Sequence, residues 1–282
     1  LMVEGWTPGN APAQIANMHT MFNVVTTLLL LPVGTLLGKL ATAILKDKRE
    51  ESEGMRVKYL LDIKHINTEK LGASVICMEG IKKELIRMMD MTKDNVSEAF
   101  DAVIERNKEK YVLVEQQEEY VDFLNKEISK YITSTVSHET TKAGSQIFNS
   151  LFSITSNIER ISDHAINIAG YSKMITDKSS VFSEDANSEL IEMQVVCMKL
   201  FTTLLKKPED VVVWHEKIAC MEQKIDDMTV QFRDNMYARI RSGKCSDEGS
   251  ILFSEILTDF ERIGDHALNI ANDILNMEIA GK

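Results

Sequence analysis

The chain has 282 residues, of which 44% are hydrophobic and 27% charged, and its formal net charge at pH 7 is −11. This acidic balance, without a basic stripe, argues against a nucleic-acid partner. The sequence contains only 4 prolines and 13 glycines, which predicts a helical protein, and its 4 cysteines form no C-x-x-C motif and suit reduced thiols in a cytosolic environment.

Residues 18–38 carry no formal charge apart from a histidine that can be protonated. A stretch of this length is at the lower limit for a membrane-spanning helix, and the kink expected at Pro32 is tolerated in lipid. Six basic residues follow between Lys39 and Lys58, so the positive-inside rule predicts that everything downstream is cytoplasmic. The alternative is an unusually apolar helix that packs on protein.

Residues 47–67 are predicted to be a charged linker. Beyond it, apolar residues recur at intervals of three, four and seven, the spacing of bundle helices. The first of these helices is expected to begin near Asn67 and to break at Thr92–Asn95. The predicted fold class is all-α, with an N-terminal transmembrane helix followed by two repeated antiparallel three-helix bundles, at 68–180 and 181–282. The remaining helices are expected at about 108–135, 140–176, 184–206, 209–241 and 247–277.

The sequence Glu-Arg-Ile-x-Asp-His-Ala-x-Asn-Ile-Ala occurs twice, at 159–169 and 261–271, with a period of 261 − 159 = 102 residues. Each copy contains a Glu and an Asp four residues apart, which places both side chains on one face of a helix. A second pair of such motifs, Glu118/Asp122 and Glu222/Asp226, has nearly the same period, 222 − 118 = 104. A period of this length predicts a duplicated domain rather than a solenoid unit.

The motifs also match in height. If the last two helices of each region form an antiparallel hairpin, two motifs at the same level must be equidistant from the turn between the helices. The midpoints between the motif centres are 140.5 in the first region and 243.5 in the second, and both fall on sequences typical of a helix break. Every acid follows a seam position by one residue, so the acids of both helices point to the same side. We therefore predict two clusters of four carboxylates: Glu118, Asp122, Glu159 and Asp163 in the first, and Glu222, Asp226, Glu261 and Asp265 in the second.

Such clusters need positive charge, and carboxylate oxygens suit Mg, Mn or Fe. The pattern predicts bound divalent or trivalent metal ions, with iron clusters among the candidates, and leaves the identity open. The alternative is that the acids line a solvated groove and pair with Lys and Arg. Six residues near the acids are expected to hydrogen-bond around the ligands rather than to bind metal themselves: Arg160, His164, Asn167, Arg262, His266 and Asn269.

With these motifs on its helices, the region from about 68 to 278 resembles the PhoU family. The resemblance implies two repeated three-helix bundles that bind metal clusters, and a role in the control of phosphate uptake. Residues 1–46, with Gly5-Trp-Thr-Pro8 ahead of the leucine run, are similar to the last membrane segment of bacterial sodium/phosphate cotransporter-family proteins, whose tails are PhoU-like. The chain, which begins with Leu1, is then expected to be a fragment.

This resemblance implies a non-enzymatic regulatory domain on the cytoplasmic side of the inner (plasma) membrane, in a full-length protein that transports sodium and phosphate. A symporter needs several membrane spans, so its ion sites would lie in a missing N-terminal portion. A homo-oligomer is compatible with the sequence. Two alternatives are a soluble PhoU-type regulator of a separate transporter and a carboxylate-bridged dimetal enzyme. The enzyme is disfavoured because no histidine has a Glu three residues before it.

Overall fold

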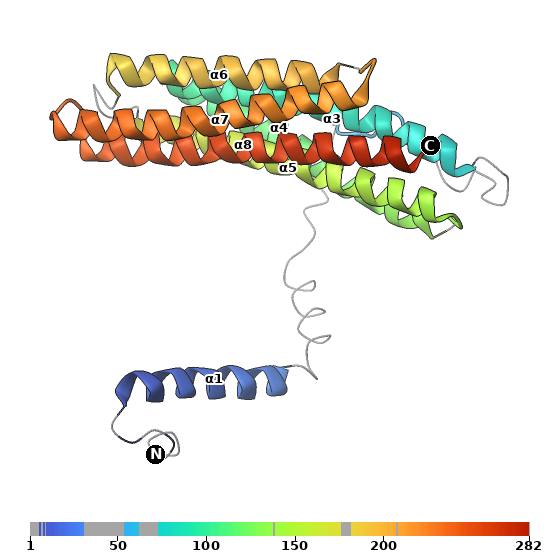
Figure 1. Ribbon diagram of the computed structural model, residues 1–282, viewed down its shortest axis with the longest axis horizontal. Helices are drawn as coiled ribbons and strands as arrows, with labels where there is room; N and C mark the ends of the chain where they lie inside the picture. Colours follow the sequence, from blue (N-terminus) through green and yellow to red (C-terminus); the bar gives the residue numbers. More distant parts are fainter. Residues whose placement is uncertain are drawn as a thin grey trace. The chain divides into compact units, whose positions relative to one another are not determined.

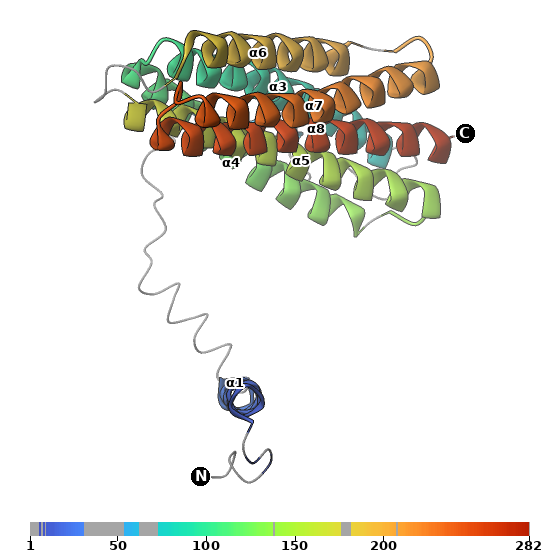
Figure 2. The same cartoon turned by 60° about the vertical axis from the view of Figure 1, so that its left-hand side comes forward.

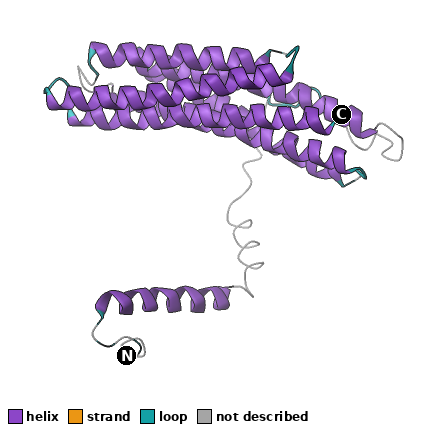
Figure 3. Cartoon of the chain, in the orientation of Figure 1, coloured by secondary structure: helices purple, strands orange, loops and turns teal. Residues whose placement is uncertain are grey.

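The computed structural model describes residues 6, 8, 10–30, 54–61, 73–137, 139–175, 182–206 and 208–281. All regular elements in these ranges are α-helices, as Figure 3 shows, which confirms the predicted all-α class. The chain divides into two compact units, Leu1–Gly54 and Met55–Lys282.

The first unit contains α1, Ala11–Leu30, which has no buried residue. The Asn10 side chain accepts a hydrogen bond from the Ala13 amide at 3.2 Å and caps the start of this helix. The predicted membrane helix at 18–38 begins inside α1, and its residues 31–38 lie outside the described residues, as does most of the predicted linker. Among the helices that the structure describes, none has the length and apolarity required to cross a membrane.

The second unit contains six long helices (Figure 1). Apart from the first, they agree with the predicted helices to within three residues at each end. Their bounds are Ala73–Ile104 for α3, Lys108–Val136 for α4, Lys142–Ile175 for α5, Glu184–Leu205 for α6, Val211–Arg241 for α7 and Asp247–Ala280 for α8. Helices α3 to α5 are called the first repeat and α6 to α8 the second repeat.

Local chemistry sets the ends of several of these helices. The side chains of Asn107, Ser183, Asp210 and Ser246 accept hydrogen bonds from backbone amides in the first turns of α4, α6, α7 and α8, which satisfies donors that have no partner within a helix. Between α7 and α8, Gly243 has a φ of 66°, in the left-handed region that favours glycine. The turn predicted at this midpoint is confirmed.

The break predicted at Thr92–Asn95 is wrong, because α3 is continuous through these residues. Both end residues of this segment are fully buried and have hydrogen-bond partners. The Thr92 hydroxyl donates to the Met88 carbonyl at 3.0 Å, and the Asn95 amide donates to Ser162 Oγ in α5 at 3.1 Å. The polar run therefore connects α3 to α5 inside the bundle and does not mark a loop.

Helices α5 and α8, the last of each repeat, lie side by side in both views and join the two repeats (Figures 1 and 2). The apolar seams of all six helices form one hydrophobic core. Its largest fully buried side chains are Phe100, Phe148, Phe201, Phe253 and Phe260. Because α5 and α8 carry the duplicated motif, this packing places the two predicted acid clusters in one compact body.

A short segment of the second unit ahead of α3, at residues 55–61, is held against α3 by Glu84, a fully buried residue of that helix. One Glu84 carboxylate oxygen accepts hydrogen bonds from the amides of Lys58 and Tyr59 at 3.0 and 2.9 Å, and the other pairs with Arg87. The Tyr59 carbonyl lies so close to Gly80 that a Cβ at Gly80 would meet it at 2.7 Å. Only glycine fits there without displacement of the segment.

Candidate metal centre

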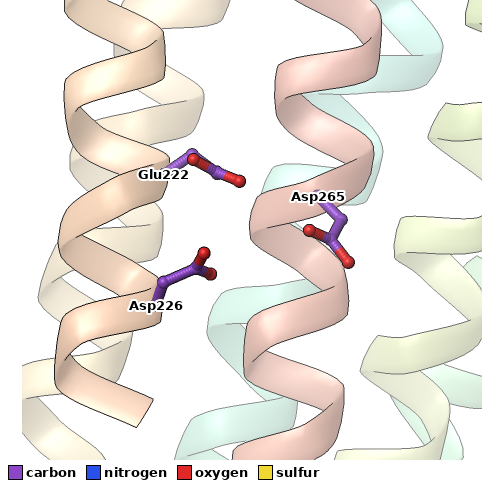
Figure 4. Close-up of side chains that lie close together, drawn as sticks. All are labelled: Glu222, Asp226 and Asp265. Atoms are coloured by element: carbon purple, nitrogen blue, oxygen red, sulfur yellow. The ribbon is translucent and has the colours of Figure 1, made fainter. Parts of the chain in front are cut away.

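Three acidic side chains converge between α7 and α8 in the second repeat (Figure 4). Glu222 and Asp226 of α7 and Asp265 of α8 each offer a carboxylate oxygen, and these oxygens all lie within 4.8 Å of one another. All three residues are partly buried. We call this group the triad, and its oxygens could bind one cation together. The fourth acid predicted for this cluster, Glu261, is not part of this group.

Close packing of the two helices brings the triad together. A Cβ at Gly264 would lie 3.1 Å from Ile225 Cγ2, so α8 approaches α7 at a point where a larger residue would not fit without adjustment. Gly264 and Ile225 immediately precede Asp265 and Asp226. This glycine contact therefore sets the distance across which the two aspartates face each other.

The triad is electrostatically suited to a cation. Partial burial, followed by the charges of Asp226 and Asp265, raises the pKa of Glu222. Partial burial, followed by the charges of Asp265 and Glu261, raises the pKa of Asp226. Asp226 Oδ1 is also buried and has no hydrogen-bond partner in the described part of the chain. A bound cation would satisfy that oxygen and offset the repulsion, and an all-oxygen ligand set fits Mg, Mn or Fe.

The four acids of the first repeat also lie near one another. Burial and then the charges of Asp163 and Asp122 raise the pKa of Glu118 to about 7, and burial and then Asp163 raise the pKa of Glu159. However, the triad is the only group of three candidate ligands within 4.8 Å in the described residues, so the first repeat contains none. Lys126 Nζ lies 2.5 Å from Asp122 Oδ2 and supplies a positive charge from within the protein.

The residues predicted to surround the ligands mainly connect the two repeats. His164 of α5 donates through Nδ1–H to Asp259 Oδ1 of α8 at 2.8 Å, and His266 of α8 donates through Nδ1–H to Asn157 Oδ1 of α5 at 2.9 Å. The two imidazole rings stack with centroids 5.5 Å apart. Burial and then the charges of His164 and Arg160 lower the pKa of His266 to about 4.

Of the other four flanking residues, the two asparagines also donate hydrogen bonds across the repeats, whereas Arg160 has no hydrogen bond or ion pair among the described residues. Asn167 donates to Asp259 Oδ1 at 3.4 Å, and Asn269 donates to Asn157 Oδ1 at 3.5 Å. Arg262 forms an ion pair with a predicted ligand, Asp265, at 3.0 Å. It is the only one of the six with a hydrogen bond or ion pair to a predicted ligand among the interactions that the structure describes.

Sequence reasoning missed Asp259 and Asn157, the acceptors on the opposite helices. Asp259 is 6% exposed and also accepts a hydrogen bond from the Tyr171 hydroxyl at 3.1 Å. The two residues are separated by 259 − 157 = 102, the period of the repeat, and each lies two residues before its motif. Extending the repeat by two residues toward the N-terminus would have found both positions. Lys126 was also missed, since the residue 104 positions later is Val230 and the repeat gives no signal for a lysine.

Comparison with known proteins identifies one family. The PhoU domain matches residues 85–171 and 199–274, more than half of the chain. A curated relative, "Phosphate-specific transport system accessory protein PhoU homolog 1" of Thermotoga maritima, is 22% identical over 200 residues, which are 70% of this chain and 85% of the relative.

Two crystal structures have a similar fold at 16% sequence identity. The phosphate transport system regulatory protein PhoU from Streptococcus pneumoniae aligns with a TM-score of 0.64 over 74% of this chain and 98% of its own. PhoU from Pseudomonas aeruginosa aligns with a TM-score of 0.65 over 76% of this chain and 100% of its own. At this identity the two structures bear on the fold alone, which they show to be the PhoU fold of two repeated helical domains.

Proposed function

The chain belongs to the PhoU family, and from this premise we propose that it is a regulator of phosphate transport that acts on a separate transporter. The proposal is supported by two similar proteins, which are named as an accessory protein and a regulatory protein of phosphate transport. The family is regulatory and not enzymatic. The acid clusters are therefore assigned a binding role and no reaction.

The triad is the proposed metal site of the second repeat, with Glu222, Asp226 and Asp265 as ligands. The observation that carries this assignment is the buried Asp226 Oδ1, which has no hydrogen-bond partner in the described residues although two other carboxylates lie beside it. A bound cation supplies positive charge to three ligands on two helices, so it would tie α7 to α8. Glu261 is proposed to contribute charge from the edge of the site, since it raises the pKa of Asp226.

The first cluster, formed by Glu118, Asp122, Glu159 and Asp163, is proposed to be a weaker metal site. The ammonium group of Lys126 already holds Asp122. A cation that binds all four acids must displace this lysine or tolerate its repulsion. We therefore expect the triad to fill first when metal is limiting.

Elemental analysis of the purified chain tests the metal assignment. After incubation with Mn²⁺ or Fe²⁺ and removal of free metal, the wild-type protein should retain metal that Asp226→Asn loses. Glu216→Gln is the matched control, because Glu216 is an exposed acid on the same helix outside the triad. Equal metal content in Asp226→Asn and Glu216→Gln would refute the assignment.

A second candidate places the same regulator in the cytoplasmic tail of a sodium/phosphate cotransporter. It is favoured by the likeness of residues 1–46 to a transporter segment and by the charge-free stretch at 18–38. The separate regulator is better supported, because the curated relative is named as an accessory protein of a phosphate-specific transport system. Membrane fractionation distinguishes the two readings. If the chain stays in the membrane fraction after carbonate extraction, it is the tail of a cotransporter. If carbonate releases the chain, it is a separate regulator.

A further inference from the structure

An open pocket lies beside the triad, where α5 and α8 meet. Its lining includes Arg160 and His164 from the first repeat and Arg262 and His266 from the second. The repeat period of 102 relates Arg160 to Arg262 and His164 to His266. We call this the junction pocket. The duplication brings two equivalent pairs of nitrogen-bearing side chains to one place.

One guanidinium of the junction pocket, that of Arg160, interacts with Glu159 and Asp163 only through longer-range charge attraction among the described residues. Arg160 is exposed and has no ion pair or hydrogen bond with any residue that the structure describes. Arg262 uses Nη1 to pair with Asp265 and has further N–H donors. A guanidinium presents parallel N–H donors that match the oxygens of a tetrahedral oxyanion. In a protein of net charge −11, these two guanidinium groups supply positive charge to a pocket that Glu222 and Asp265 also line.

The two histidines add acceptors. Each uses Nδ1–H as a donor across the junction, to Asp259 or to Asn157. In the neutral imidazole the other nitrogen, Nε2, is then an acceptor. Neither Nε2 has a hydrogen-bond partner among the described residues, and both rings line the pocket. The pocket therefore combines guanidinium donors with ring nitrogens that can accept a hydrogen bond when the imidazole is neutral.

We propose that the junction pocket binds inorganic phosphate, with Arg160 and Arg262 donating to its oxygens and an imidazole Nε2 accepting its P–OH proton. At neutral pH phosphate carries negative charge together with one such proton, which this combination of groups recognises. The inference deepens the proposed function and rests on it, since a regulator of phosphate transport would then bind the ion that it regulates.

Two carboxylates that line the same pocket oppose an anion. Asp265 is offset in part by Arg262, and Glu222 belongs to the triad. A cation on the triad would offset both charges, so phosphate should bind more tightly to metal-loaded protein than to chelator-treated protein. The metal and the anion would then favour each other's binding by the same factor.

Calorimetric titration of the Mn²⁺-loaded chain with inorganic phosphate tests the proposal. We expect saturable binding with a Kd of about 1 mM or tighter, and about 10-fold weaker binding by Arg160→Gln. Arg241→Gln is the matched control, because Arg241 is an exposed arginine at the end of α7 that does not line the pocket. Absent binding, or equal weakening in both variants, would overturn the proposal. Circular dichroism melts establish that both variants fold.

Competing anions test the proposed recognition of the P–OH proton. Sulfate has no proton at neutral pH, and methyl phosphate is mostly a dianion without one, so both should bind about 10-fold more weakly than inorganic phosphate. Equal binding of sulfate would overturn the role of the histidines. Equal binding of methyl phosphate would overturn the assignment to the free ion and indicate the phosphoryl group of a larger ligand.

Metal content separates this inference from the proposed metal site. Arg160→Gln should keep the metal of the wild-type chain while it loses affinity for phosphate. A wild-type chain that retains metal but does not bind phosphate would refute only the junction pocket. A chain that binds phosphate through Arg160 but retains no metal would refute only the metal site.

Discussion

In the second repeat carboxylate oxygens of Glu222, Asp226 and Asp265 lie within 4.8 Å of one another, whereas in the first repeat Lys126 pairs with Asp122 and the acids form no such group among the described residues. Two substitutions accompany this difference. Gly264, which lets α8 approach α7, replaces Ser162, and Val230 replaces Lys126. The comparison teaches that a duplicated motif sets where the acids lie, while positions that differ between the two copies decide whether the acids form a compact cation site.

Copying the lysine of the first repeat into the second should have the largest effect. In Val230→Lys an ammonium group one turn from Asp226 should weaken Mn²⁺ binding at the triad by about 3 kcal/mol, roughly 100-fold, because like charges repel at short range. Equilibrium dialysis against Mn²⁺ measures this change. Val230→Met, similar in length but uncharged, is the control, and equal affinity in the two variants would contradict the explanation. The reciprocal change Lys126→Met should strengthen Mn²⁺ binding at the first cluster.

Removing the close approach of α7 and α8 should have the next largest effect. A Cβ at residue 264 would lie 3.1 Å from Ile225 Cγ2, so Gly264→Ala should lower the free energy of unfolding by about 2 kcal/mol through overpacking. It should also separate Asp265 from Asp226 and weaken Mn²⁺ binding. Urea unfolding and dialysis measure the two changes. The double variant that also carries Ile225→Val should recover part of the unfolding free energy and part of the Mn²⁺ affinity. A Gly264→Ala protein with unchanged stability and affinity would show that the contact is not tight.

The acids of the first cluster should make the free energy of unfolding depend on pH. Burial and neighbouring acids raise the pKa of Glu118 to about 7, so its ionised form is disfavoured in the folded state and stability falls as pH rises from the unfolded-state pKa toward 7. In metal-free protein, Glu118→Gln should therefore be stabilising at pH 8, by about 1.5 kcal/mol after allowance for solvent screening. The gain should vanish near pH 4. Urea unfolding at both pH values, with Glu216→Gln as control, tests this, and an equal gain at pH 4 and pH 8 would exclude the charge as its cause.

A substitution at the junction between the repeats should have the smallest effect. Asp259→Asn makes the acceptor of His164 the same residue type as Asn157, the acceptor of His266. Replacing a charge-assisted hydrogen bond by a neutral one should cost about 1 kcal/mol of unfolding free energy. Thermal unfolding at pH 7 measures the loss, and the reverse change Asn157→Asp provides the matched comparison. A more stable Asp259→Asn protein would mean that the buried carboxylate is poorly compensated.

The sequence predicted most of the fold because helical periodicity and the 102-residue repeat are both visible in it. It failed at Thr92–Asn95, since the hydrogen-bond acceptor of the Asn95 amide is Ser162, 67 residues away in the chain. Polar residues that are buried through distant contacts look like a loop in a linear pattern. The membrane helix at 18–38 stays a prediction beyond Leu30.

The carboxylates that form the triad were also predicted from the sequence, because register and facing follow from helix geometry. The difference in compactness between the two acid clusters was not predicted. It depends on the fit of Gly264 against Ile225 and on the reach of Lys126, and both Gly264 and Lys126 stand at positions where the two copies differ. The inter-repeat partners of the histidines depend on how α5 packs against α8, and no single-helix pattern encodes that packing.

The hold of Glu84 on the backbone of Lys58 and Tyr59 has a mechanical consequence. Any pull on the chain before Met55 reaches the bundle first at this buried carboxylate and at the carbonyl of Arg56, to which Arg87 and Tyr120 donate hydrogen bonds. These hydrogen bonds thus fix the segment at the point where a pull from the upstream chain arrives. A pull that arrives there loads α3 and α4, which carry Glu84, Arg87 and Tyr120, before it reaches the two helices of the triad.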